Sequence, residues 1–250
     1  MSNKILILCG LFLCITVMKS FALSGKEIIE KSDAAIRGNT THTTYEITIK
    51  ARRFTRTMTI EAVDDRNGKR SFAEILSPPK DKGNRFLLID QNMWQYVPTI
   101  QKTTKISPSM MLDNWMGSDF TNDDIVKESS IVKDYVHTLV GNEAVGSEKC
   151  HKVELKPLPD AAVVWGKILY FAREGDFLPV REEFYNEHGV LKKVLDYSDF
   201  RPMGGRVIPT QYLMKTVKKD DQFTLLKIVA VQFDLPVDET CFSMQHLKRR

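Results

Sequence analysis

The sequence has few cysteines, which excludes one common way of stabilising a secreted domain. Of its four cysteines, two lie in the first 22 residues, and only Cys150 and Cys241 remain in the rest of the chain. Two cysteines cannot build a disulfide-rich scaffold, so a hydrophobic core must hold the fold together. Because sequence spacing gives no distance between them, it stays open whether Cys150 and Cys241 are bridged.

An excess of charge of one sign is also missing. The formal net charge is +4 over 250 residues, and it falls to +2 without residues 1–22, which carry Lys4 and Lys19. Basic side chains form only short clusters, such as Arg52–Arg53, and no nucleic-acid-binding module is recognisable. A nucleic-acid partner would require a clustered basic face, so the sequence predicts none.

Motifs for catalysis, metals or cofactors are absent from the sequence. The five histidines are scattered without the HExxH or CxxC spacing of zinc sites, and there is no glycine-rich phosphate loop or G-x-S-x-G elbow. Cys150 and His151 are adjacent in a strand-like segment, which directs their side chains to opposite faces and prevents a catalytic dyad. The sequence therefore predicts no metal, no cofactor and no enzymatic activity.

The one long apolar run lies at the N-terminus and has the features of a secretory signal peptide. Lys4 precedes apolar residues 5–17, a stretch too short to span a membrane as a helix, and Ser20-Phe21-Ala22 matches a signal-peptidase site. Neither cysteine in this segment follows a small residue, as a lipidation site would require. We therefore expect residues 1–22 to be removed, leaving residues 23–250 as a single domain, soluble in the periplasm.

From residue 23 onward, the apolar pattern predicts one helix followed mainly by strands. Ser24–Glu27 is a capping-box pattern, and apolar residues at helical spacing continue until Gly38. From Thr41 the period changes to two, and about eleven to thirteen strands follow without the βαβ alternation of a parallel sheet. This predicts a mainly β fold, a large curved antiparallel sheet with a few short helices packed on one face.

The strand pattern breaks between residues 107 and 130. A helix capped by Ser107 would have an apolar face, and Thr121 would begin a second short helix. The apolar face of the first helix would consist of Met111, Leu112, Trp115 and Met116. We expect this helix to form a lid over the sheet, with Gly117–Ser118 as its flexible point.

Apolar and aromatic side chains also gather where a plain sheet would not need them, which predicts an apolar ligand cavity. Methionine adapts to irregular apolar partners, although each such residue taken alone could instead belong to the core. The predicted cavity and lid residues are Trp94, Tyr96, Met110, Met111, Trp115, Met116, Phe120, Val164 and Trp165. Lys167 and Arg181 are predicted at the cavity rim, where they would meet anionic head groups; solvated strand positions are the alternative.

Two long motifs resemble the outer-membrane lipoprotein-sorting protein family, in its LolA-like subgroup. The first is WMGSDFTNDD over residues 115–124, preceded by Ser109-Met110-Met111, and the second is PDAAVVWGK over residues 159–167. The resemblance extends over essentially the whole chain after residue 22. It implies a half-open β-barrel whose concave face is lined with apolar side chains and covered by helices.

The resemblance also implies a function. Such a protein is a periplasmic carrier or accessory protein that binds lipid or lipoprotein acyl chains in an apolar cavity for transfer towards the outer membrane. Members of the subgroup are linked with RND-type exporters, so the resemblance names an inner-membrane exporter as a partner. Two alternatives stay open: a non-carrier scaffolding subunit of an exporter, whose cavity is filled by its own side chains, and a lipid-acting extracytoplasmic enzyme.

Overall fold

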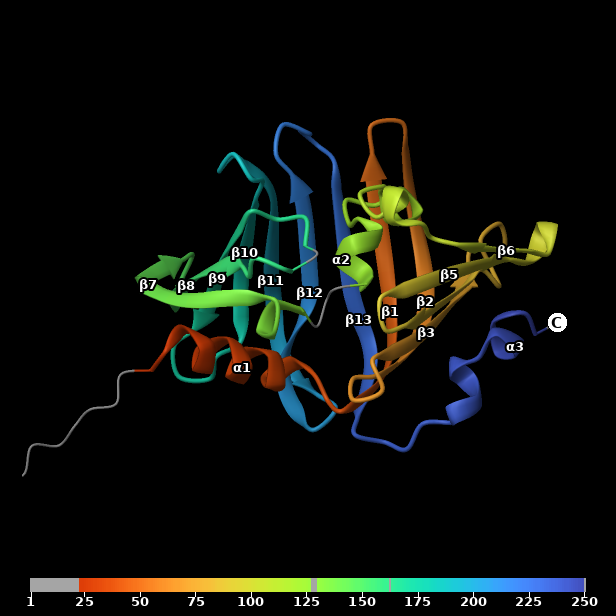
Figure 1. Ribbon diagram of the computed structural model, residues 1–250, viewed down its shortest axis with the longest axis horizontal. Helices are drawn as coiled ribbons and strands as arrows, with labels where there is room; N and C mark the ends of the chain where they lie inside the picture. Colours follow the sequence, from red (N-terminus) through yellow and green to blue (C-terminus); the bar gives the residue numbers. More distant parts are fainter. Residues whose placement is uncertain (1–22, 127–129, 162, 250) are drawn as a thin grey trace, which may run out of the picture.

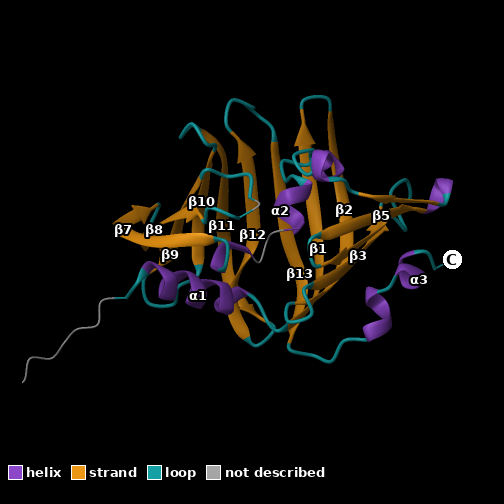
Figure 2. Ribbon diagram, viewed as in Figure 1, coloured by secondary structure: helices purple, strands orange, loops and turns teal. Residues whose placement is uncertain are grey.

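The chain folds around one large antiparallel sheet. The computed structural model describes residues 23–126, 130–161 and 163–249, so the predicted signal peptide lies outside the described residues. Within these ranges, 13 strands form the sheet and short helices lie against it (Figures 1 and 2). The predicted mainly β fold, with its curved antiparallel sheet, is therefore confirmed.

The strands fall into two groups along the chain. The first group is β1 (Thr40–Ala51), β2 (Phe54–Asp65), β3 (Arg70–Ser77), β4 (Arg85–Ile89), β5 (Asn92–Val97) and β6 (Lys102–Lys105). The second group is β7 (Tyr135–Val145), β8 (Glu148–Pro157), β9 (Lys167–Arg173), β10 (Pro179–Tyr185), β11 (Leu191–Met203), β12 (Arg206–Thr216) and β13 (Phe223–Phe233). A segment over residues 106–134, here called the crossover segment, joins the two groups.

The order of the strands explains why the crossover segment is needed. The order is β6-β5-β4-β3-β2-β1-β13-β12-β11-β10-β9-β8-β7, so β6 and β7 lie at opposite edges of the sheet. The chain reaches one edge at β6, crosses to the other edge, and returns by hairpins until β13 pairs with β1. Figure 1 shows the crossover segment, with its helix α2 (Asn122–Val126), passing over one face of the sheet.

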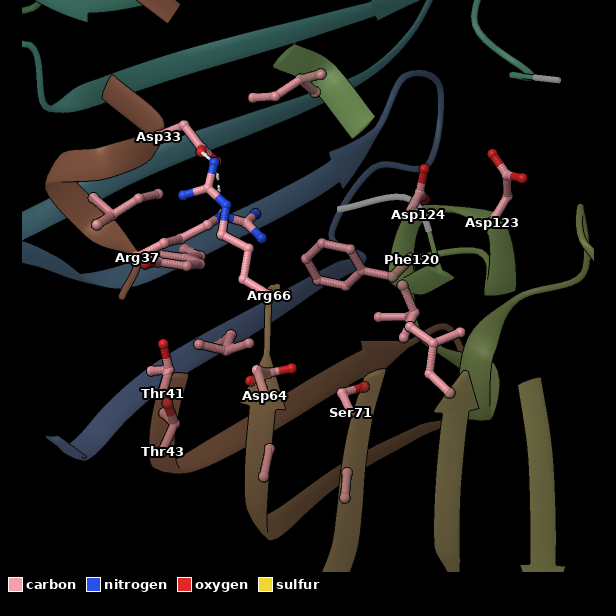
Figure 3. A pocket seen from close by; sticks show the side chains of 18 of the residues that line it. Asp33, Arg37, Thr41, Thr43, Asp64, Arg66, Ser71, Phe120, Asp123 and Asp124 are labelled. Carbon is pink, nitrogen blue, oxygen red and sulfur yellow. Dashed lines mark hydrogen bonds and ion pairs between the residues drawn. The ribbon is translucent and has the colours of Figure 1, made fainter. Parts of the chain in front are cut away.

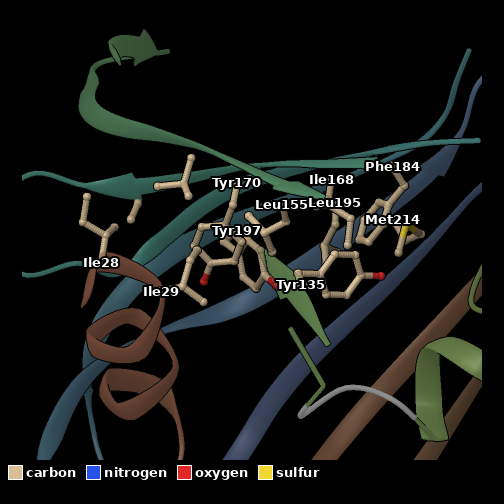
Figure 4. Packing of buried hydrophobic residues seen from close by; sticks show 12 residues of the cluster. Ile28, Ile29, Tyr135, Leu155, Ile168, Tyr170, Phe184, Leu195, Tyr197 and Met214 are labelled. Atoms are coloured by element: carbon tan, nitrogen blue, oxygen red, sulfur yellow. The ribbon is translucent and has the colours of Figure 1, made fainter. Parts of the chain in front are cut away.

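That face, here called the inner face, is also covered by the first helix. Helix α1 (Gly25–Ile36) begins with the predicted capping box, in which the Ser24 side chain and Glu27 bond each other's backbone N–H groups. Its fully buried Ile28 and Ile29 pack against the inner side chains of the second strand group, including Tyr170 (Figure 4). Each such isoleucine stabilises the fold by roughly 1.5–3 kcal/mol through burial.

The opposite, outer face is covered at one end by the C-terminal segment. The 3₁₀ turn η5 (Glu239–Phe242) and helix α3 (Met244–Leu247) follow β13 and pack against β3 and β4 (Figure 2). Their Phe242 and Leu247 join Phe72, Leu87 and Tyr96 in one buried cluster. Both faces of this part of the sheet are therefore covered, one by the crossover segment and the other by the C-terminal segment.

The predicted helix with Met111 and Trp115 on one face is wrong. The segment contains two 3₁₀ turns, η2 (Pro108–Met110) and η3 (Trp115–Gly117), and Met116 has a φ of 50°, outside the helical region. The side chain of Leu112 is 65% exposed, whereas that of Trp115 is 4% exposed, so the two do not share a face. The chain instead folds back on itself: the Trp115 N–H donates to the Phe120 carbonyl at 2.8 Å, and Asn114 forms a bridge with Thr121.

The second predicted helix of the crossover segment is present as α2. The Thr121 hydroxyl accepts a hydrogen bond from the Asp124 N–H at 3.1 Å, and the Asp124 carboxylate accepts one from the Thr121 N–H at 2.8 Å. This reciprocal pair is a capping box, which satisfies two backbone donors that a helix start leaves open. No helix in the described part of the chain is long and apolar enough to cross a membrane.

Both remaining cysteines are free thiols, which settles the pairing that the sequence left open. Cys150 is buried with Phe171 and Val180 on the outer face of the second strand group, and Cys241 lies in η5.

We expect two free thiols per molecule when the unfolded, unreduced protein is titrated. In the folded protein, burial raises the pKa of the Cys150 thiol to about 11, so alkylation of Cys150 at pH 8 should be slow. Titration of no free thiol after unfolding would contradict this assignment.

Candidate functional site

A large cavity lies between the inner face of the sheet, helix α1 and the crossover segment. Its volume is about 730 Å³, and both strand groups contribute to its wall. Figure 3 shows part of the cavity wall, with Thr41 and Thr43 of β1, Asp64 of β2 and Phe120 of the crossover segment among the labelled side chains. A cavity of this size is within the range that binds one small organic ligand.

Apolar side chains from the inner face make most of the cavity wall. The second strand group contributes Ile168, Leu195 and Met214, which belong to the cluster shown in Figure 4. The first strand group contributes Ile47, Phe86 and Met93, which pack in a second cluster around Trp115. Every second side chain of a strand points to the inner face. Residues of these two core clusters therefore also line the cavity.

Tyrosines give this apolar wall a polar component. Five of the seven tyrosines line the cavity: Tyr45, Tyr135, Tyr170, Tyr197 and Tyr212. The Tyr170 hydroxyl bonds the Ser32 hydroxyl of α1 at 2.7 Å, and the Tyr197 hydroxyl donates to the Glu182 carboxylate at 2.6 Å. Burial raises the pKa of both Tyr170 and Tyr197 well above its usual value, so both hydroxyls stay protonated at neutral pH.

The bond between Tyr170 and Ser32 fixes α1 to the sheet, and its loss should be measurable. Both residues are buried, so Tyr170→Phe would leave the Ser32 hydroxyl without its partner in an apolar environment. We expect Tyr170→Phe to lower the free energy of unfolding by about 1–3 kcal/mol in urea denaturation. Tyr185→Phe is the matched control, because Tyr185 bonds Glu183 in a more exposed position. Equal losses in the two variants would contradict the role of the buried bond.

The crossover segment is attached to the sheet by a partly polar cluster around Asp124. One oxygen of Asp124 accepts from the Lys193 ammonium at 3.0 Å, and the other accepts from the Trp165 indole N–H at 3.1 Å. The Lys193 ammonium also lies 5.3 Å from the centre of the Trp165 ring, a cation–π distance. The Lys193 and Asp124 side chains are only 9% and 11% exposed, so this ion pair is largely shielded from water.

The structure places three of the nine predicted cavity residues in the cavity wall, namely Trp115, Phe120 and Trp165. Met110, Met111 and Met116 instead pack behind the wall, against the apolar cluster that contains Trp115. Val164 does not line the cavity, whereas the adjacent Val163 does.

The other predicted site residues lie on the outer face. Trp94 and Tyr96 point away from the cavity and pack in the cluster under the C-terminal segment. Lys167 lies 3.9 Å from Glu154 and over the Tyr185 ring, and Arg181 is paired with Asp196 at 2.7 Å. Neither basic side chain lines the cavity.

Other cavity residues were not anticipated from the sequence, because their signal is an ordinary strand pattern. Leu195 and Tyr197 belong to an alternating strand, and Tyr170 lies in the apolar run of β9, so nothing local marks them as a ligand wall. The polar end of the cavity, with Asp33 of α1, Arg37 directly after α1 and Arg66 after β2, depends on contacts between distant segments. Among the described residues, no group of three or more His, Cys, Asp or Glu side chains is arranged to hold a metal ion.

Solved structures with the same fold come from several bacteria. A DUF1329 family protein from Desulfovibrio piger is 20% identical, with a TM-score of 0.82, and the match covers 89% of this chain and 97% of that one. A LolA superfamily protein from Nitrosomonas europaea is 21% identical, with a TM-score of 0.75 and coverage of 90% and 100%. An outer-membrane lipoprotein-sorting protein domain from Vibrio parahaemolyticus is 20% identical, with a TM-score of 0.76 and coverage of 90% and 98%.

The sequence was also compared with family models and with curated proteins. The sequence matches none of the curated proteins. A family model described as "Uncharacterized protein" matches residues 67–249, which is more than half of the chain. At about one-fifth identity the solved structures establish the fold alone, which this chain shares with a LolA superfamily protein and a lipoprotein-sorting protein domain. The chain therefore belongs to the family of this model, a LolA-like family with the fold of the outer-membrane lipoprotein-sorting proteins.

Proposed function

We propose that residues 23–250 form a periplasmic carrier domain that binds the acyl chains of a lipid or lipoprotein in the inner-face cavity. In this proposal, residues 1–22 direct export and are removed before Leu23. The carrier receives its cargo at the inner membrane, with an RND-type exporter as the partner there, and transfers it towards the outer membrane. The reaction is binding and release, without bond chemistry.

The observation that carries this proposal is the cavity of about 730 Å³ between the sheet, α1 and the crossover segment. Its wall is built from side chains such as Ile168, Leu195 and Phe86, which favour an apolar ligand over water. A scaffolding subunit would need no such space, because its own side chains would fill it. The cavity therefore supports the carrier over the scaffold.

Burial of the ligand can provide the required affinity. Each methylene group moved from water into the cavity contributes about 0.8 kcal/mol, so one long acyl chain contributes on the order of 10 kcal/mol before ordering costs. Tyr197 and Tyr212, in contact with each other at a ring-centre distance of 4.8 Å, add flat apolar surface to the wall. Release then requires an acceptor or a change in the crossover segment, which bounds the cavity.

Mass spectrometry of organic extracts tests the proposal. The protein would be expressed with its leader, purified from the periplasmic fraction without detergent, and extracted with chloroform and methanol. The carrier function predicts a co-purifying lipid or acylated species in near-stoichiometric amount. Extracts without lipid, from a protein that also fails to bind added amphiphiles, would contradict it.

A further inference from the structure

Two arginines from different elements meet at one end of the cavity. Arg37 directly follows α1, and Arg66 follows β2, where its backbone N–H donates to the Asn39 carbonyl at 2.8 Å. Both side chains face the Asp33 carboxylate, as Figure 3 shows. The Arg37 Nε lies 3.1 Å from one Asp33 oxygen, and Arg66 donates to the other.

Asp33 is the buried partner of this trio. Its side chain is 1% exposed, whereas those of Arg37 and Arg66 are 21% and 35% exposed. All three residues line the cavity, so the guanidinium groups lie where a ligand can reach them. Within this trio, one carboxylate lies between two guanidinium groups. The other charged residues that line the cavity next to Arg66 are three acidic and two basic ones, Asp64, Asp65, Asp90, Lys69 and Arg70, so this end offers a ligand the N–H donors of two guanidinium groups rather than an excess of positive charge.

We propose that Arg37 and Arg66 bind the anionic head group of the amphiphile, a carboxylate or phosphate, while its apolar chain lies along the cavity wall. Asp33 then acts as a resident carboxylate that holds the two guanidinium groups when the cavity is empty. The inference rests on the proposed carrier function and adds the class of ligand, an amphiphile with an oxyanion head group.

The chemistry of the guanidinium group supports this assignment. It presents N–H donors in a planar fork that matches the oxygens of a carboxylate or phosphate, and such charged hydrogen bonds strengthen away from bulk water. Lys193, a basic residue of the inner face, is already paired with Asp124. Lys167 and Arg181 lie on the outer face with acidic partners, so they serve as controls rather than as ligands.

Competition binding with matched amphiphiles tests the site. Delipidated protein would be loaded with the neutral dye N-phenyl-1-naphthylamine at low ionic strength. The dye would be displaced by oleate, by oleoyl lysophosphatidic acid or by oleyl alcohol, which has the same chain without the charge. We expect the parent protein to bind the better of the two anions about tenfold more tightly than the alcohol.

Arg66→Gln and Arg37→Gln should each lose most of this preference and bind oleyl alcohol like the parent. Arg66→Lys should keep part of the preference for the anion. The outer-face control Arg181→Gln should keep the whole preference.

Replacement of Asp33 should have the opposite effect. Asp33→Asn removes the internal competitor, so the anions should bind several-fold more tightly although the melting temperature of the empty protein falls. A purely structural role for the trio would instead make Asp33→Asn and Arg66→Gln weaken the binding of all three ligands alike.

The outcomes separate this inference from the carrier function. If the parent and all variants bind oleate, lysophosphatidic acid and oleyl alcohol equally, the head-group site is wrong and the carrier function stands. If Asp33→Asn weakens anion binding as much as Arg66→Gln does, the role of Asp33 as a competitor is wrong. If no amphiphile displaces the dye or binds the parent, the carrier function itself fails. The comparison of oleate with lysophosphatidic acid shows which oxyanion the site prefers.

Discussion

Replacing Trp115 with alanine is expected to lower the free energy of unfolding by about 3–5 kcal/mol. The Trp115 side chain is 4% exposed, and its ring lies 5.3 Å from that of Phe86 in a tilted contact. It also packs with Met58 and Ile60 in the core of the first strand group. Alanine would remove most of this contact area and leave a void, because the strands around it cannot close in. Chemical denaturation of delipidated protein measures the loss.

Two further variants test the reason for this loss. Trp115→Phe should cost much less than Trp115→Ala, because the Trp115 indole nitrogen has no hydrogen-bond partner among the residues that the structure describes. Leu112→Ala, in the same segment but at a side chain that is 65% exposed, should change stability little. A loss below about 1 kcal/mol for Trp115→Ala would mean that Trp115 belongs to a loosely held lid rather than to the core.

Replacing Lys193 with methionine is expected to cost a similar amount, about 3–5 kcal/mol, because it leaves the Asp124 charge in a largely buried site without its cation. The Lys193 ammonium and the Asp124 carboxylate are 3.0 Å apart, and the two side chains are only 9% and 11% exposed. Asp124 also caps α2 and accepts a hydrogen bond from the Trp165 indole N–H, so it attaches the crossover segment to the sheet.

The matched control for this variant is Lys26→Met. Lys26 and Glu30 form an ion pair on the exposed side of α1, with a distance of 3.8 Å and side chains that are 65% and 47% exposed. Such surface pairs contribute about 0–1 kcal/mol, so Lys26→Met should leave the melting temperature almost unchanged. Equal effects of Lys193→Met and Lys26→Met would show that the pair with Asp124 does not hold the crossover segment.

Much of the fold could be predicted because it depends on local patterns. The alternation of apolar and polar residues marks strands such as β1 and β11, and the structure has 13 strands where about eleven to thirteen were expected. The capping residues Ser24 and Thr121 correctly marked the starts of α1 and α2. The pairing of β13 with β1, by contrast, joins residues such as Thr41 and Phe233 that lie far apart in the sequence, and no local pattern encodes it.

The candidate site was harder to predict, because it depends on which side of the sheet is covered by which segment. Strand periodicity shows that Trp94 and Met93 point to opposite faces, yet only the fold shows that Met93 faces the cavity and Trp94 the C-terminal segment. In the same way, Val163 rather than Val164 lines the cavity, a difference of one residue in a loop without regular period. The contact of Arg66 with Asp33 joins a turn to a helix and has no sequence signature.

Blocking the cavity tests whether the cavity is the ligand-binding site. Ala73 of β3 lines the cavity, so Ala73→Trp would fill part of it, whereas Ala230→Trp places the same bulk at an exposed position of β13 outside it. Both delipidated variants would first be checked for an unchanged fold by circular dichroism and then titrated with a fluorescent fatty-acyl probe. We expect Ala73→Trp to lose at least about tenfold in affinity for the probe, equivalent to about 1.4 kcal/mol, and Ala230→Trp to bind the probe like the parent. If Ala73→Trp binds the probe as tightly as the parent does, the ligand binds elsewhere and the inner-face cavity is not the carrier site.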